Sequence, residues 1–280
     1  MRIRCSEQWR SRLDCRFLGS CLRSLSHLNQ DTGADTSHKY AHFYLDHLPR
    51  FTVRRDQIKQ LVQTILNLAV RGQLLPTSAS SERPRPLREF AQLQNGYAFK
   101  SEWFVRTGIR LLRNVNVSHG VIRWDDVAFL SESRAAEFER FQLNEGDIVF
   151  SLDRPFIASG TKVARIRPDD APCILLQRVG RFQVTRQRLS PDYLFLWLHS
   201  PHFTDQINPG RSNGVPHVSS KQVEAAEIFA PPLTEQHRIV AEVNRLMEVC
   251  GRLESQLTTV QTESNRLLEA VLHQSLTDAP

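Results

Sequence analysis

The sequence predicts an α+β protein in which a strand-rich domain lies between two long helices. Apolar residues recur at alternating steps of four and three through the last 45 residues, which is typical of a helix that packs along another helix. Short β-type runs separated by turn residues fill the middle of the chain. A shorter helical pattern precedes them, so the predicted order is helix, strand-rich domain and longer helix.

The first helix is predicted from about Asp56 to Arg71, where apolar residues keep the three-four spacing. Gly72 suits the position after a helix end, and Pro76 prevents the helix from continuing. We therefore predict a helix within residues 51–76. Prolines and small hydroxyl residues in 77–86 then predict a surface linker.

Residues 87–230 are predicted to form one mixed domain rich in strands. Its β-type runs are Ile109 to Leu112, Val121 to Trp124, Asp147 to Ser151, Thr161 to Ile166, Cys173 to Leu176 and Arg181 to Thr185. Turn residues at Ser118 to Gly120 and Asn144 to Asp147 separate several of these runs. Helical patches are expected at Ser133 to Phe141 and at Asp192 to Ser200, where an aromatic and apolar cluster belongs to the core.

The longer helix is predicted over residues 231–276. Pro231-Pro232 closes the domain, Thr234 is a suitable N-cap, and Glu235 is favourable in the first helical turn. A helix of roughly 40 residues is about 60 Å long, so it must lie along a partner helix. Because two helices joined through an intervening domain can return antiparallel, we expect an antiparallel coiled coil. The residues predicted to pair the helices are Ile58, Leu61, Ile65, Leu68, Ile239, Val243, Leu246, Leu253, Leu257, Val260, Leu267 and Val271.

The composition is that of a soluble globular protein, with 40% apolar residues. No apolar run approaches the roughly 18 residues needed to span a bilayer, and the Arg-rich start lacks the apolar stretch of a secretory signal. We therefore expect a cytoplasmic protein. Five scattered cysteines without a Cys-x-x-Cys pair predict reduced structural thiols rather than a metal or redox site. They are Cys5, Cys15, Cys21, Cys173 and Cys250.

The net charge of +6 is spread unevenly along the chain. Residues 1–85 carry 14 basic and 7 acidic side chains, residues 86–231 carry 18 and 16, and residues 232–280 carry 4 and 7. Eight basic side chains between Arg154 and Arg188 are opposed only by Asp169 and Asp170, which predicts a surface that faces a polyanion. Arginine outnumbers lysine and suits bidentate contacts to phosphate and guanine, although a codon bias would give the same excess.

Several strings resemble the specificity subunit of type I restriction-modification systems. The helix strings are Leu48 to Leu61, Gln63 to Pro76 and Pro231 to Val240. The strings Pro86 to Ala91, Asn95 to Ser101, Leu111 to Val117 and Gly146 to Ser151 are similar to landmarks of that family's target recognition domain. The similarity covers nearly all of the chain from Phe43 to Leu276.

The resemblance implies a protein that recognises double-stranded DNA and binds DNA adenine methyltransferase subunits and a restriction and translocation subunit. A full-length member has two recognition domains joined by two helical spacers, and each domain reads half of a split site. Here there is one such domain, and Arg12 to Leu28 resembles the end of the central spacer. The resemblance therefore implies that residues 1–50 are part of a helical spacer and that residues 51–76 form a spacer helix. The chain is then either part of a longer subunit or a half-subunit that pairs with a copy of itself or with an N-terminal half. S-adenosylmethionine, ATP and Mg²⁺ are implied only for the partner subunits, and no cofactor or metal is expected on this chain.

Base reading in a groove needs Arg, Lys, Asn, Gln or Ser on loops, with further basic side chains on phosphates. The predicted DNA-binding residues are Asn95, Lys100, Arg113, Asn114, Asn116, Ser118, Arg154, Lys162, Arg178, Arg181, Arg211, Ser212, Asn213, His217 and Lys221. Each of these alone also suits a solvated surface or a turn. Their clustering across loops of one domain is what favours DNA binding.

The sequence lacks the motifs of an enzyme. A nuclease needs clustered carboxylates with a lysine, and an adenine methyltransferase needs a Gly-rich loop and an Asn/Asp-Pro-Pro-aromatic motif; neither is present. We therefore expect a non-catalytic subunit.

Two alternatives remain: a coiled-coil interaction module whose strand-rich domain binds protein, and a degenerate hydrolase. Steep weakening by salt would favour DNA over the protein-binding alternative, and metal-dependent activity would indicate a hydrolase.

Overall fold

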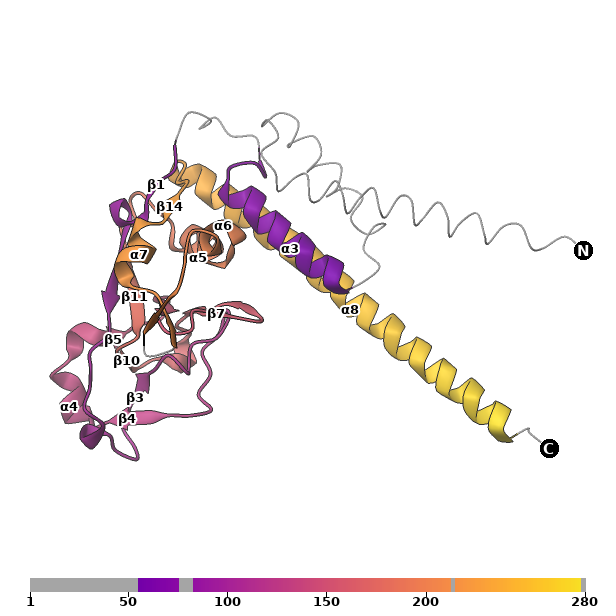
Figure 1. The fold of residues 1–280 in the computed structure, drawn as a ribbon, viewed down its shortest axis with the longest axis horizontal. Coiled ribbons are helices and arrows are strands. Elements are labelled where there is room, and N and C mark those ends of the chain that lie inside the picture. Colours follow the sequence, from indigo (N-terminus) through magenta and orange to yellow (C-terminus); the bar gives the residue numbers. More distant parts are fainter. Residues whose placement is uncertain (1–54, 76–82, 213–214, 278–280) are drawn as a thin grey trace, which may run out of the picture. The chain divides into compact units, whose positions relative to one another are not determined.

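The computed structural model describes residues 55–75, 83–212 and 215–277 and has the predicted order of helix, strand-rich domain and longer helix (Figure 1). The chain divides into two compact units. One contains residues up to 76 together with residues from 241 onward, and the other contains residues 77–240. The α+β class is therefore confirmed. No described helix is both long enough and apolar enough to cross a membrane.

Helix α3 (Arg55–Val70) lies along the first part of helix α8 (Leu233–Thr277), with the two chain directions opposed (Figure 1). The three-four spacing places the apolar residues of α3 on one face, and Ile58, Leu61, Ile65 and Leu68 are all buried. In α8, Ile239, Val243, Leu246 and Cys250 are buried in the same way. This is the antiparallel helix pair that the sequence predicts.

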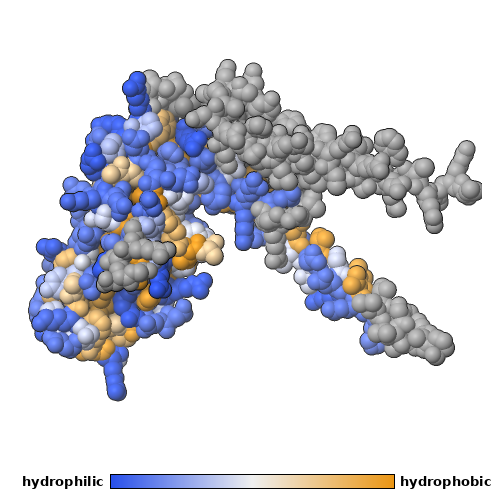
Figure 2. Space-filling model, viewed as in Figure 1, coloured by the Kyte–Doolittle hydropathy of each residue, from blue (hydrophilic) through white to orange (hydrophobic). Residues whose placement is uncertain are grey.

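The apolar face of α8 continues beyond its buried segment. Leu253 and Leu257 are partly buried, whereas Val260 is 59% exposed and Leu267 is 68% exposed. Figure 2 shows apolar surface alternating with hydrophilic surface along this helix. Among the described residues, α3 does not cover Val260 and Leu267, because α3 is much shorter than α8. The side chain of Val271 lies outside the described residues.

The helix ends depend on specific backbone chemistry. Gly72 has a φ of +67°, and Gln73 N donates to Leu68 O at 2.8 Å, so the predicted glycine ends α3 in a left-handed turn. The predicted start of α8 is off by two residues, because an N-cap at Thr234 would make Glu235 the first helical residue. The helix begins at Leu233, and Thr234 lies inside its first turn, because Pro232 O accepts hydrogen bonds from the N–H groups of Glu235 and Gln236.

The strand-rich unit contains two four-stranded sheets. One has the order β4-β3-β10-β5 and is mixed, since β10 runs parallel to β3 and antiparallel to β5. Its strands are β3 (Ile109–Leu112), β4 (Ala128–Leu130), β5 (Gln142–Leu143) and β10 (Cys173–Leu175). The other has the order β2-β11-β6-β9 and is antiparallel throughout. Its strands are β2 (Ala91–Asn95), β6 (Ile148–Ser151), β9 (Val163–Arg165) and β11 (Val179–Val184).

Both faces of the antiparallel sheet are buried. Successive side chains of a strand point to opposite faces of its sheet, so neighbouring residues of β6 pack on different sides. Val149 belongs to one hydrophobic cluster with Leu111 and Ile174 of the mixed sheet. On the opposite face Phe150 contacts Phe203, with ring centroids 5.9 Å apart. Every residue of β6 is accordingly buried, which explains why the apolar residues Ile148 to Phe150 follow one another without a polar residue between them.

Short elements complete the unit. The two-stranded pairs are β1 (Arg85–Pro86) with β14 (Glu227–Ile228), β7 (Phe156–Ile157) with β8 (Gly160–Thr161), and β12 (Gly210–Ser212) with β13 (Val215–His217). The helices are α4 (Glu132–Ala136), α5 (Pro191–His199), α6 (Pro201–Thr204) and α7 (Ser220–Ala225). The 3₁₀ turns are Leu87–Glu89, Ser101–Trp103, Glu139–Phe141 and Pro168–Asp170.

The strand predicted over Val121 to Trp124 is wrong. Only an isolated bridge joins Val117 to Ile122 there. The segment stays a loop because the amide nitrogen of Asn116 donates to the carbonyl oxygens of Arg123 and Asp126, at 2.9 and 2.8 Å. These side-chain bonds take the place of strand pairing.

Candidate nucleic-acid interface

A polar cluster around Asp153 brings together three segments that are distant in the sequence. Asp153 follows β6, Arg178 lies in the turn between β10 and β11, and His217 ends β13. Asp153 Oδ1 lies 2.7 Å from His217 Nδ1, and Asp153 Oδ2 lies 3.7 Å from Arg178 Nε. Arg178 Nη1 in turn lies 3.4 Å from His217 Nδ1. One carboxylate therefore orients a guanidinium and an imidazole on a surface formed by loops.

The backbone at this cluster is strained. Arg154 has a φ of +46° and Arg178 a φ of +71°, the only non-glycine residues with positive φ in the part of the chain that the structure describes. Side chains other than glycine rarely adopt these angles, and such strain concentrates at functional sites. Arg154 N donates to Pro216 O at 2.8 Å, and Leu152 N donates to Arg178 O at 2.8 Å. These bonds hold both arginines in place while their side chains stay exposed.

Lys162 lies beside this cluster but points inward. It is only 8% exposed, and its ammonium donates to the carbonyl oxygen of Asn114. Burial lowers the pKa of Lys162, and the charge of Arg154 lowers it further, against an opposite effect from Asp153. Lys162 thus supports the loop that contains Asn114, so its prediction as a DNA contact is corrected.

The loop after β3 is held together by two of the predicted DNA-binding residues. Asn116 is 1% exposed, and its side-chain oxygen accepts from Arg113 N at 3.1 Å. Arg113 Nη2 lies 2.6 Å from Asp126 Oδ1. These side chains are occupied within the loop, which corrects their assignment to base reading. Asn114 and Ser118 are partly buried, and Val115 between them is 58% exposed.

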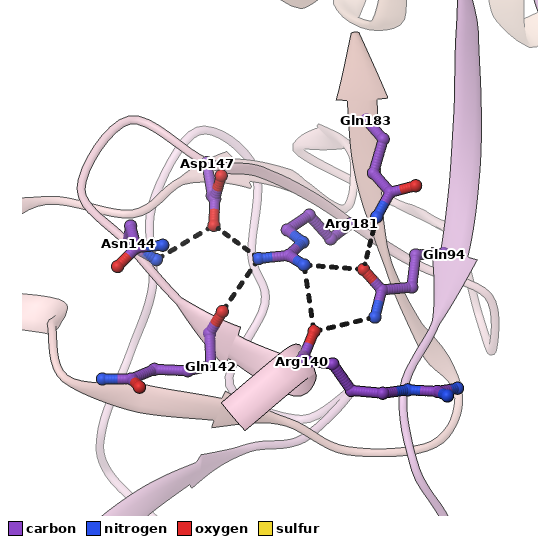
Figure 3. A network of polar contacts seen from close by, with 7 residues as sticks. All are labelled: Gln94, Arg140, Gln142, Asn144, Asp147, Arg181 and Gln183. Carbon is purple, nitrogen blue, oxygen red and sulfur yellow. Dashed lines mark hydrogen bonds and ion pairs between the residues drawn. The ribbon is translucent and has the colours of Figure 1, made fainter. Parts of the chain in front are cut away.

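Arg181 is the centre of a network that joins the two four-stranded sheets (Figure 3). Its guanidinium donates to Gln94 Oε1 at 2.6 Å, to Gln142 O at 2.8 Å and to Arg140 O at 3.1 Å, and it pairs with Asp147 at 3.2 Å. The Arg181 side chain is 14% exposed. It is therefore a structural residue, and its prediction as a DNA contact is corrected.

Within the described part of the chain, the remaining predicted residues form no hydrogen bond or ion pair with Asp153, Arg178 or His217, although Asn95 is close to them because it pairs with Gly180 of β11. Asn95, Lys100 and Lys221 are exposed; Asn95 lies 3.4 Å from Ser220 Oγ, and Lys100 pairs with Glu102 at 3.6 Å. Arg211 and Ser212 form part of β12, but their side chains are not described, and Asn213 lies outside the described residues. The β12–β13 hairpin that contains them is nevertheless anchored to the cluster through the bridge between Asp153 and His217.

Sequence reasoning missed the role of Asp153. Its partners lie 25 and 64 positions away, and no local pattern signals such pairing. Among the residues that the structure describes, no three His, Cys, Asp or Glu side chains gather in a way that could hold a metal ion.

Residues 83–260 match the family model of the type I restriction modification DNA specificity domain. The chain is 40% identical over 236 residues to the EcoAI specificity subunit of Escherichia coli, covering 79% of this chain and 39% of that protein. It is 29% identical over 186 residues to the MjaVIII specificity subunit of Methanocaldococcus jannaschii, covering 65% of this chain and 44% of that one. The chain thus spans less than half the length of both curated relatives.

Solved structures share the fold. The HsdS subunit from Thermoanaerobacter tengcongensis superposes with a TM-score of 0.55 and 16% identity, over 93% of this chain and 57% of that one. A chain from a structure of type I R-M complex assembly gives a TM-score of 0.57 and 15% identity, over 92% and 58% of the two chains. Since the family model covers well over half of the chain, the protein belongs to the family of type I restriction modification DNA specificity domains.

Proposed function

We propose that the strand-rich unit recognises one half of a bipartite DNA sequence, as the specificity component of a type I restriction-modification complex. The observation that carries this proposal is the Asp153 cluster, which fixes the exposed arginines Arg154 and Arg178 and the base of the β12–β13 hairpin. Arginine donates in pairs to the O6 and N7 atoms of guanine and to phosphate oxygens. A loop surface with fixed guanidinium groups supports direct readout together with phosphate contacts.

The helical unit supplies the second part of the proposal. A stiff antiparallel pair of helices sets a fixed distance between two recognition domains, and the exposed apolar residues of α8 suit contact with other protein chains. We propose that methyltransferase subunits dock on these helices and that a restriction subunit joins the same complex. In this proposal the chain itself catalyses nothing and binds no cofactor.

DNA binding by the reconstituted complex tests the proposal through its salt dependence. Each phosphate contact contributes about −0.9 to the slope of log K against log salt. We expect Arg154→Gln to reduce the magnitude of that slope by about 1, and Arg178→Gln to reduce discrimination between matched and mismatched duplexes by about 10-fold or more.

Arg186→Gln is the matched control, because it removes the same charge from an exposed side chain beyond the other end of β11. The six residues of the extended strand β11 separate it from Arg178 by about 20 Å. Binding that is indifferent to salt, or equal effects of the three substitutions, would contradict the proposed DNA contacts.

A further inference from the structure

The strand-rich unit contains a cavity of about 390 Å³ away from the Asp153 cluster, between β1, the loop after β11 and the entry to α8. Three arginines line it together with an aromatic ring and the residues that begin α8. The lining residues on which the argument depends are Arg83, Arg85, Arg188, Phe90, Pro231 and Leu233. The volume falls within the range of roughly 300 to 1,000 Å³ that is typical of small-ligand sites.

The positive charge of this cavity is not balanced by the described residues around it. Arg85 forms an ion pair with Glu89, whereas Arg188 Nη1 donates to the neutral carbonyl oxygen of Glu89 at 3.0 Å. Arg83 is exposed and has no hydrogen-bond or ion-pair partner among the described residues. Among the described ion pairs, the Glu89 carboxylate balances one of the three guanidinium groups, which leaves a net positive site.

Two of the guanidinium groups are held against the same ring. The Cζ atom of Arg188 lies 4.8 Å from the Phe90 ring centroid, and that of Arg85 lies 5.4 Å from it. Phe90 is 4% exposed, so the ring is a fixed platform. Stacking on an aromatic face orients a guanidinium without neutralising it, and its N–H groups remain available to an anion.

Buried hydrogen bonds fix both walls of the cavity. Gln236 is fully buried, and its side-chain nitrogen donates to Arg188 O at 2.9 Å and to Pro231 O at 2.6 Å. The fold thus fixes the backbone of Arg188 and Pro231 on the two walls of the cavity. The long helix α8 begins at its wall, and the positive end of the helix dipole adds to the charge of the arginines.

We propose that this cavity binds an oxyanion of the phosphate class, a function separate from the reading of bases at the Asp153 cluster. Guanidinium groups match the oxygens of phosphate through paired hydrogen bonds. Two sources share this chemistry: a free phosphate or diphosphate, and a phosphate of the DNA backbone.

Titration calorimetry of the full chain with pyrophosphate, at constant ionic strength set with sodium chloride, tests the proposal. We expect saturable binding of one pyrophosphate per chain to the native protein. Arg83→Gln should weaken it at least tenfold, and this substitution is compatible with folding because Arg83 is exposed and unpaired among the described residues. The control Arg186→Gln removes one charge from the loop that leads to Arg188 without touching the cavity, and it should change the affinity less than twofold.

A competition arm identifies the source. If a short DNA duplex displaces pyrophosphate, the site exists and its natural ligand is a phosphate of the DNA backbone. If pyrophosphate stays bound beside the duplex, the site exists and its natural ligand is a free anion. The proposal is overturned if pyrophosphate binds no better than chloride, or if Arg83→Gln and Arg186→Gln weaken binding equally. Because sequence discrimination depends on Arg178, loss of this site and loss of base reading are measured separately.

Discussion

Substitution of Arg181 by glutamine should destabilise the protein severely while leaving its exposed surface nearly unchanged. The guanidinium of Arg181 supplies hydrogen bonds to the two backbone carbonyls of Arg140 and Gln142 and to the Gln94 side chain, and an ion pair to Asp147 (Figure 3). Glutamine is too short to replace these contacts and has no charge. The lost contacts join β11 to β2, to β5 and to the residues just before β5 and β6.

The size of the effect follows from burial. Removing one partner of a buried charged pair costs about 3 to 5 kcal/mol, and each hydrogen bond to a charged group is worth about 1.5 to 3 kcal/mol. The Asp147 side chain is 23% exposed, so water compensates part of the loss. We therefore expect a loss of about 3 kcal/mol in the free energy of unfolding, which corresponds to a melting temperature about 6 to 12 °C lower for a unit of this size.

Urea unfolding followed by tryptophan fluorescence measures this loss, since Trp197 is fully buried in the same unit. Arg154→Gln is the matched control, because it removes the same charge from an exposed side chain and should cost less than about 0.5 kcal/mol. Arg181→Gln with unchanged stability but impaired DNA binding would refute the reasoning and restore Arg181 as a DNA contact.

Two further predictions concern His199 and Asp153. Burial lowers the pKa of His199 to about 4 from its ordinary 6.5, so its contribution to stability is complete above about pH 6.5 and is lost as the pH falls towards 4. At pH 5 the native protein should have lost about 2 kcal/mol of unfolding free energy through His199. In His199→Gln, the fall in unfolding free energy from pH 7 to pH 5 should be smaller by that amount. An identical pH dependence in both proteins would disprove the role of His199. Asp153→Asn removes the charge that orients Arg178 and His217, so discrimination between matched and mismatched duplexes should fall about tenfold with little change in the salt slope. Binding assays across a salt series measure both quantities, and a changed slope with intact discrimination would count against Asp153 as a positioning residue.

Local pattern predicted α3, α8 and five of the eight strands in the two four-stranded sheets, but it missed β2, β4 and β5. Gly72 ends α3 because a left-handed residue is needed there, and the spacing from Ile58 to Leu68 marks a face that is buried. The failure at Val121 to Trp124 has a definite cause. An asparagine five positions upstream of that run satisfies the backbone of the loop, and strand propensity alone contains no information about such a competitor.

The candidate site was less predictable than the fold. Arginine, lysine and asparagine on loops are suitable for DNA and equally suitable for internal hydrogen bonds, and only burial separates Asn116 and Lys162 from the exposed Arg154 and Arg178. The cluster itself depends on Asp153, whose partners come from other strands. Composition and spacing cannot reveal such long-range pairing.

The measurement that tests the central claim most directly is a map of the sequences methylated by the reconstituted methyltransferase complex. The β12–β13 hairpin, residues 210–217, would be exchanged for that of another member of the family, together with residues 153, 154 and 178. If the strand-rich unit reads DNA through the Asp153 cluster, one half of the methylated sequence changes and the other half is retained. A methylated sequence identical to that of the unmodified complex would contradict the account.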